Sequence, residues 1–122
     1  LGIEFDYIIL DLGRLESFGS VCNIQVGLIR ASNQSFVVSN ASYADVRSTF
    51  TRMLTSKLKV NSLGWIVNMV NGRLDERVLQ VVEQAESTVQ IPLIKDCYGN
   101  IFDLSANRKT SAQLDLAIRS IG

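Results

Sequence analysis

The chain of 122 residues contains no histidine. This absence excludes Ser-His-Asp and Cys-His nucleophile systems and most zinc sites, because each of them uses an imidazole. Only two cysteines occur, Cys22 and Cys97, and they lie outside any C-x-x-C spacing. We expect both thiols to be reduced in the cytoplasm and to pack as small hydrophobic groups, with a disulfide between them as the alternative. No apolar run has the length of a membrane span, and no signal peptide is visible.

Net charge is also lacking. Twelve basic and twelve acidic side chains cancel, which removes any argument from net charge for a nucleic-acid or acidic-membrane partner. Apolar residues make up 47% of the chain and charged residues 20%, a balance typical of globular rather than disordered proteins. We expect a single domain over residues 1–122. The first residue is Leu rather than Met, so we expect the chain to be part of a longer protein.

Four apolar runs are typical of β-strands. They are "FDYIILD" at 5–11, "QSFVVSN" at 34–40, "LGWIVNMV" at 63–70 and "IPLI" at 91–94. The first is apolar almost throughout, as in strands buried on both faces of a parallel sheet. Pro92 indicates that the first residues of the fourth run are not fully paired.

Apolar residues that recur every three or four positions predict four helices between and after these runs. Their apolar stripes span residues 21–29, 46–58, 74–89 and 114–121. Ser42, with Asp45 three residues later, resembles a capping box with a shorter acid and marks the start of the second helix. The alternation predicts an α/β fold with three α/β/α layers around a mainly parallel sheet, because right-handed crossovers lay helices on a sheet.

Asp11 follows the first predicted strand and is itself followed by Leu12 and Gly13. The carboxyl edge of a parallel sheet is where ligands bind, because strand ends and helix starts converge there. A carboxylate at this edge can hold Mg²⁺ through water, accept a phosphoryl group or cap a turn. The turn is the structural alternative, since Asp bonds its own downstream backbone and Gly takes positive φ.

The order of these motifs resembles the carboxyl-terminal half of the ParA/MinD family of P-loop ATPases, the deviant Walker class that includes the CpaE/TadZ proteins and nitrogenase iron protein. "FDYIILD" is similar to the Walker B strand of the family, and "SFVVSNASYADVRSTFTRML" to the next strand and long helix. "LGWIVNMV" is similar to a strand that carries Asn, "IPLIKD" to a short strand with an acid, and "SAQLDLAIRSIG" to the final helix. The likeness covers nearly the whole chain, and the order of the five motifs carries it.

This resemblance implies a role for four residues. Asp11 would orient the water shell of Mg²⁺ on an ATP phosphate, and Gly13 would lie in the switch segment that senses the γ-phosphate. Asn68 would bond the purine edge, with a turn residue as the alternative. Asp96 would contact base or ribose, although "IPLIKD" aligns in two registers. The resemblance also implies ATP and Mg²⁺ as cofactors, a homodimer, and a role in intracellular positioning or partitioning.

The phosphate-binding loop of that family is missing. None of the eight glycines is followed by lysine, so no backbone cradle with its lysine is present for the β- and γ-phosphates. Leu12-Gly13-Arg14 also replaces the proline that usually follows the family's aspartate. We therefore expect no ATP hydrolysis by the chain alone. Either a missing amino-terminal segment or a partner chain supplies the P-loop unit, or a degenerate relative kept the P-loop NTPase-like scaffold for binding.

A receiver-like signalling domain is one alternative. It would use Asp11 as the phospho-acceptor and Ser39 as the hydroxyl at the end of the next strand. The lysine that such domains need after the following strand is absent from "IVNMVNG".

A non-catalytic interaction module is another alternative. The second predicted helix and its end carry four basic residues against Asp45, namely Arg47, Arg52, Lys57 and Lys59. In the ParA-like proteins that the chain resembles, basic surface patches bind a DNA backbone non-specifically, with affinity that falls steeply with salt. A solvated helix face is the ordinary interpretation. A membrane-associated partner is a further option within the family resemblance.

Overall fold

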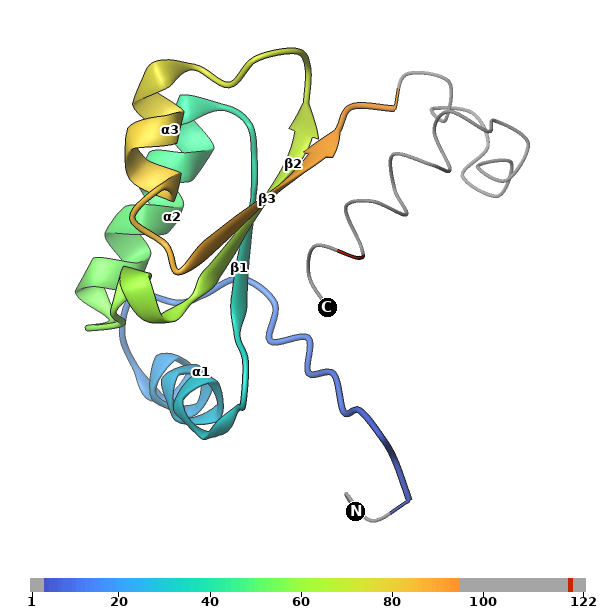
Figure 1. Cartoon of the computed structure of the whole chain (residues 1–122). Helices are drawn as coiled ribbons and strands as arrows, with labels where there is room; N and C mark the ends of the chain where they lie inside the picture. Colours follow the sequence, from blue (N-terminus) through green and yellow to red (C-terminus); the bar gives the residue numbers. More distant parts are fainter. Residues whose placement is uncertain (1–3, 95–118, 120–122) are drawn as a thin grey trace.

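The computed structural model describes residues 4–94 and 119 of the chain (Figure 1). The elements are α1 (Ser20–Ala31), β1 (Phe36–Asn40), α2 (Tyr43–Thr55), η1 (Val60–Ser62), β2 (Gly64–Val70), α3 (Glu76–Val82) and β3 (Ser87–Pro92). The three strands form one sheet in the order β1-β2-β3, and both pairings are parallel. The predicted α/β fold with a parallel sheet is therefore confirmed for this part of the chain.

The core lies between one face of the sheet and two helices. Trp65 and Val67 of β2 belong to one buried cluster with Val46 of α2 and Val78 of α3, and all four side chains have no exposed surface. Figure 1 shows α2 and α3 side by side next to the sheet. The parallel crossovers from β1 to β2 and from β2 to β3 run through these two helices, which explains why both cover the same strands.

The start of α2 is as predicted. Ser42 is its N-cap, and its Oγ accepts a hydrogen bond from the backbone N–H of Asp45 at 3.2 Å. Of the predicted apolar stripe, Val46 and Met53 are buried, whereas Leu54 is 55% exposed. The cap thus sets the point at which this helix begins, because it satisfies a backbone donor that has no partner inside the helix.

The third helix is shorter than the apolar stripe at 74–89 predicts. α3 ends at Val82, and Val89 lies on β3 instead of on the helix. β3 starts at Ser87, before the predicted run at 91–94, and Val89 pairs with Ile66 of β2. The β-branched pair Thr88 and Val89 suits a strand that pairs along its length, and this pairing outweighs the weak helical period.

The prediction of a strand at residues 5–11 is wrong for this structure. The segment has no strand conformation and no ladder partner. Tyr7 is 87% exposed and Ile9 is 91% exposed, and Figure 1 shows this segment projecting away from the sheet. An apolar run favours a strand, but a strand forms only where a neighbour pairs with it, and none of the described residues does so.

The structure describes only one of the two cysteines. Cys22 is free and buried in α1, and its Sγ lies 3.4 Å from Oγ of Ser56. Its predicted packing as a small buried group is confirmed, whereas the reduced compartment stays a prediction. Cys97 and the predicted helix at 114–121, except Arg119, lie outside the described residues. In the part of the chain that the structure covers, no helix combines the length and apolar character needed to cross a membrane.

Candidate functional site

Two polar residues lie side by side at the carboxyl edge of the sheet, and one of them, Asn68, is a predicted site residue. Asn40 ends β1, Asn68 lies near the end of β2, and the two are direct Cα partners in the parallel ladder. The loops that lead into α2 and α3 leave the sheet at this edge. Because ligands of open parallel sheets bind outside the carboxyl ends of the strands, this edge is the candidate site.

The loop from β1 to α2 is held by its own polar groups. The backbone N–H of Asn40 donates to Oδ2 of Asp45 at 2.8 Å, and the N–H of Ser42 donates to Oδ1 of Asn40 at 2.9 Å. With the Ser42 cap, these bonds fix the start of α2. They also occupy backbone donors that a phosphate group would otherwise use.

The end of β2 is irregular at Asn68. The ladder shifts register between Val67 and Val70, and Met69 has a φ of 57°. Such a left-handed backbone is uncommon for a residue other than glycine and costs free energy. Oδ1 of Asn68 accepts a hydrogen bond from the N–H of Met69 at 2.9 Å. The exposed Asn68 amide therefore keeps its two N–H donors unpaired within the described part of the chain.

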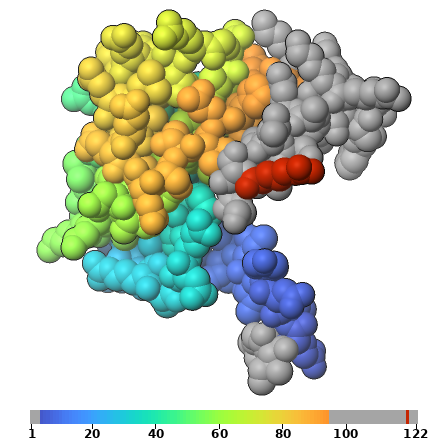
Figure 2. All heavy atoms as spheres, in the orientation of Figure 1, coloured from blue at the N-terminus to red at the C-terminus, as the bar shows by residue number. Residues whose placement is uncertain are grey.

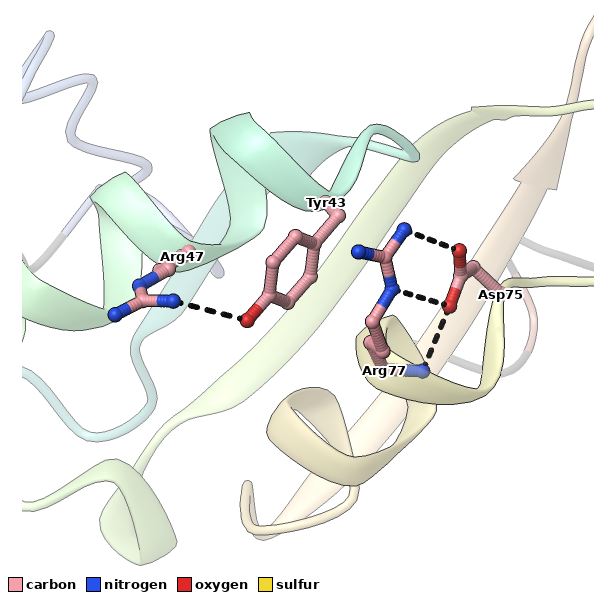
Figure 3. A network of polar contacts seen from close by, with 4 residues as sticks. All are labelled: Tyr43, Arg47, Asp75 and Arg77. Atoms are coloured by element: carbon pink, nitrogen blue, oxygen red, sulfur yellow. Dashed lines mark hydrogen bonds and ion pairs between the residues drawn. The ribbon is translucent and has the colours of Figure 1, made fainter.

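A polar network links the starts of α2 and α3 beside this edge (Figure 3). The guanidinium of Arg77 lies 4.4 Å from the ring centroid of Tyr43, and Nη1 of Arg47 donates to the Tyr43 hydroxyl at 3.2 Å. Arg77 also donates from Nε and Nη2 to the two carboxylate oxygens of Asp75, at 3.2 and 2.9 Å. Asp75 is the N-cap of α3 and accepts the backbone N–H of Arg77 at 2.8 Å. The network orients the two helix starts, although its ion pair is exposed and thus worth little.

This network predicts a small dependence of stability on acid pH. The side-chain hydrogen bond from Arg77, followed by its backbone N–H, lowers the pKa of Asp75 below its ordinary value of 3.8. The stabilisation is present in full above that value and is lost as pH falls through the lowered pKa of the folded state. We expect Asp75→Asn to lower the unfolding midpoint at pH 6 and the difference to shrink steadily below pH 4. Thermal unfolding followed from pH 2 to 7 measures it.

The Arg77→Leu background provides the control for this prediction. Without the guanidinium, the effect of Asp75→Asn should become smaller at neutral pH. A difference between the wild type and Asp75→Asn that persists undiminished at the lowest pH would contradict the prediction.

The structure places Asp11 and Gly13 in a turn outside the sheet. The backbone N–H of Gly13 donates to Oδ1 of Asp11 at 3.0 Å, and Gly13 has a φ of 69°. This is the turn chemistry given above as the structural alternative. Asp11 is exposed and does not lie at the end of a strand, so the described residues do not join it to Asn68. Asp96 lies outside the described residues.

The segment after Asp11 is anchored by a residue that the sequence did not single out. Gln25 of α1 is only 6% exposed. Its Nε2 donates to the carbonyls of Leu12 and Arg14 at 3.0 and 2.9 Å, and its Oε1 accepts the N–H of Glu16 at 2.9 Å. The only feature of the sequence that points to this role is that Gln25 is a polar residue among the apolar positions of the predicted helix at 21–29.

Two further contacts bear on the alternative functions. Ser39 is 4% exposed, and its Oγ accepts the indole N–H of Trp65 at 2.8 Å. The Ser39 hydroxyl is therefore hydrogen-bonded inside the core. It is not exposed at the sheet edge, where a receiver-like domain would use it. In the predicted basic stripe, Arg52 donates to the carbonyl of Leu15 at 3.0 Å and Arg47 bonds Tyr43, so these two side chains have structural contacts.

Two hollows lie at the opposite end of the sheet. Their volumes are about 440 and 600 Å³, and both are lined in part by Arg30 and Lys57. The larger also includes Lys59 and Glu86. Arg30 is in the last turn of α1 and Lys57 follows the end of α2, where cations complement the helix dipole. These hollows contain none of the predicted site residues.

Among the residues that the structure covers, no three Cys, Asp or Glu side chains are grouped as a metal site. No family model matches the chain, and searches of curated proteins and of solved structures found no similar protein. The candidate site thus depends on its own geometry and on the motif order in the sequence.

Proposed function

We propose that this chain is the nucleotide-binding part of a ParA/MinD-like ATPase, with Asn68 as the residue that recognises the base. The observation that carries the proposal is the Asn68 amide, which is exposed at the carboxyl edge of a parallel sheet with both N–H donors free among the described residues. A purine edge presents ring nitrogens that accept such donors. The motif order supports the same family, whose members position or partition cargo inside cells.

The residues fit ATP only in part. The edge around Asn68 suits a base, but the loop from β1 to α2 uses its donors internally and the sequence has no lysine after any glycine. A phosphate grip therefore has to come from a missing amino-terminal segment or a partner chain. Asp11 lies in a turn away from this edge, so it would hold Mg²⁺, which keeps several waters and is shared with phosphates, only in a completed site. Hydrolysis is thus proposed only for the completed site.

Binding of a labelled adenine nucleotide tests the proposal, with fluorescence anisotropy of an ATP analogue as the measurement. We expect the chain to bind it weakly, and Asn68→Ala to weaken binding about tenfold, because one hydrogen bond to a base is worth about 1 kcal/mol or slightly more. Removal of Mg²⁺ should have little effect on the isolated chain, since the base contact dominates.

Asn33→Ala is the matched control. Asn33 is also an exposed asparagine, but it lies between α1 and β1 at the amino end of the strands. It should leave binding unchanged. Equal binding by Asn68→Ala and the wild type, or no binding by the wild type at all, would overturn the proposal.

A further inference from the structure

Residues 5–11 expose apolar side chains on both faces. Tyr7 and Ile9 are about nine-tenths exposed, and Phe5, Ile8 and Leu10 are each more than half exposed. Along an extended chain, Phe5, Tyr7 and Ile9 point to one side and Ile8 and Leu10 to the other. This pattern is typical of a strand buried inside a sheet, and it is unfavourable in water.

Further apolar side chains are exposed on α1 and on β1. Val21, Ile24 and Leu28 share one face of α1 and are 55%, 63% and 38% exposed, and Val38 of β1 is 60% exposed. Within the three-stranded sheet, β1 pairs with β2 only, so one edge of β1 has unpaired backbone groups in the described structure. Such an edge pairs readily with another strand.

The segment does not reach this edge in its own molecule. The backbone of residues 12–16 is held by Gln25, and the carbonyls of Leu15 and Glu16 accept hydrogen bonds from Arg52 and Ser56. The Asp11 turn then fixes the direction in which residues 5–11 leave. Figures 1 and 2 show them projecting beyond the body of the protein. In the described part of the chain these residues have no ladder partner.

We propose that residues 5–11 of one copy add as a parallel strand to the free edge of β1 of a second copy, and that the exchange is reciprocal. A two-fold dimer results, in which each β1 receives the segment of the other chain. Val38 of the receiving copy then lies next to the added strand, and we assign the exposed face of α1 to the same interface. The exposed side chains concerned amount to on the order of 1,000 Å² per copy, and a stable interface buries about 800 Å² per partner.

The exchange would also move a carboxylate to the candidate site. A parallel strand at residues 5–11 ends at the same edge as β1, which places Asp11 of one copy beside Asn40 of the other. Asn40 is the ladder partner of Asn68. This consequence, but not the dimer, rests on the proposed function. Each nucleotide site would then combine residues from both chains.

Sedimentation of the full chain without nucleotide tests the dimer over about a hundredfold range of concentration, because dimerisation follows mass action. We expect a dimer for the wild type and a monomer for Ile9→Lys, with the dissociation constant raised about a hundredfold or more. Trp65 emission should be unchanged in Ile9→Lys, since Ile9 is exposed in the single chain.

Leu54→Lys is the matched control, because Leu54 is an apolar residue of α2 that is 55% exposed and lies outside the proposed interface. It should remain dimeric. A synthetic peptide of residues 4–12 should bind the Ile9→Lys monomer, whose β1 edge is free, and should not bind Val38→Lys. A monomeric wild type, a dimer that Ile9→Lys leaves intact, or a peptide that does not bind would each overturn the proposal. Because no nucleotide is present, none of these results depends on Asn68.

Discussion

Replacing Trp65 with alanine should destabilise the protein by about 3–5 kcal/mol, a large part of the stability of a typical domain. Trp65 has no exposed surface and lies on the central strand β2. It belongs to the cluster that joins the sheet to Val46 of α2 and Val78 of α3. Truncation therefore opens a cavity between three elements. Urea unfolding measures the loss of stability. It is followed by circular dichroism, because the variant lacks the indole whose fluorescence would otherwise report unfolding.

The Trp65→Phe variant separates packing from hydrogen bonding. Phenylalanine keeps most of the apolar volume but leaves the buried hydroxyl of Ser39 without its donor, which costs about 1–3 kcal/mol. The double variant Trp65→Phe/Ser39→Ala removes both partners and should be more stable than Trp65→Phe alone. Leu54→Ala on the exposed side of α2, outside the proposed interface, is the control, with little expected effect. Additive single and double effects would contradict the importance of this hydrogen bond.

Replacing Gln25 with leucine should cost about 2 kcal/mol or more and release residues 12–16 from α1. Leucine has a similar volume, but it leaves the carbonyls of Leu12 and Arg14 and the N–H of Glu16 without their side-chain partner. These backbone groups are partly buried, so water replaces the lost bonds incompletely. Urea unfolding gives the loss of stability, and amide exchange of Glu16 should become faster.

The Gln25→Glu variant adds a dependence on pH. Its carboxylate would retain the bond from Glu16 but face the two carbonyls of Leu12 and Arg14, so burial and these oxygens would raise the pKa of the introduced group. A raised folded-state pKa means lost stability at neutral pH that is regained as pH falls. Gln84→Leu is the control, because Gln84 is exposed and its side chain bonds only the carbonyl of Gln80. Equal stability of Gln25→Leu and Gln84→Leu would show that the anchor is unimportant.

The anchor also connects the fold with both proposals. Gln25 holds the chain directly after the Asp11 turn, and this turn directs residues 5–11 away from the sheet. Gln25→Leu removes the bonds that hold residues 12–16, so residues 5–11 should no longer leave the protein in one fixed direction. Exchange between copies should then become less specific, whereas β2 with Asn68 stays intact. The contact of Asn68 with the base and dimer formation thus depend on different parts of the protein and can be lost separately.

The sequence by itself determined the elements whose signals are local. The N-cap at Ser42 is a contact within four residues of chain, and the strands at 36–40 and 64–70 follow from short β-branched and apolar runs. The alternation of strands with helices was enough to predict parallel pairing, because a crossover through a helix returns the chain in the same direction. The turn at Asp11 and Gly13 was also predicted as an alternative from these two residues alone.

The tertiary structure alone decided what depends on partners far along the chain. Residues 5–11 have the composition of a strand, but a strand requires a neighbour. The sequence of this segment does not show whether such a neighbour is present. Val89 lies on β3 because β2 offers a ladder partner, although its spacing also suited a helix. The bonds from Gln25 to residues 12–16 and from Trp65 to Ser39 likewise join distant positions, and only the folded chain brings their donors and acceptors together.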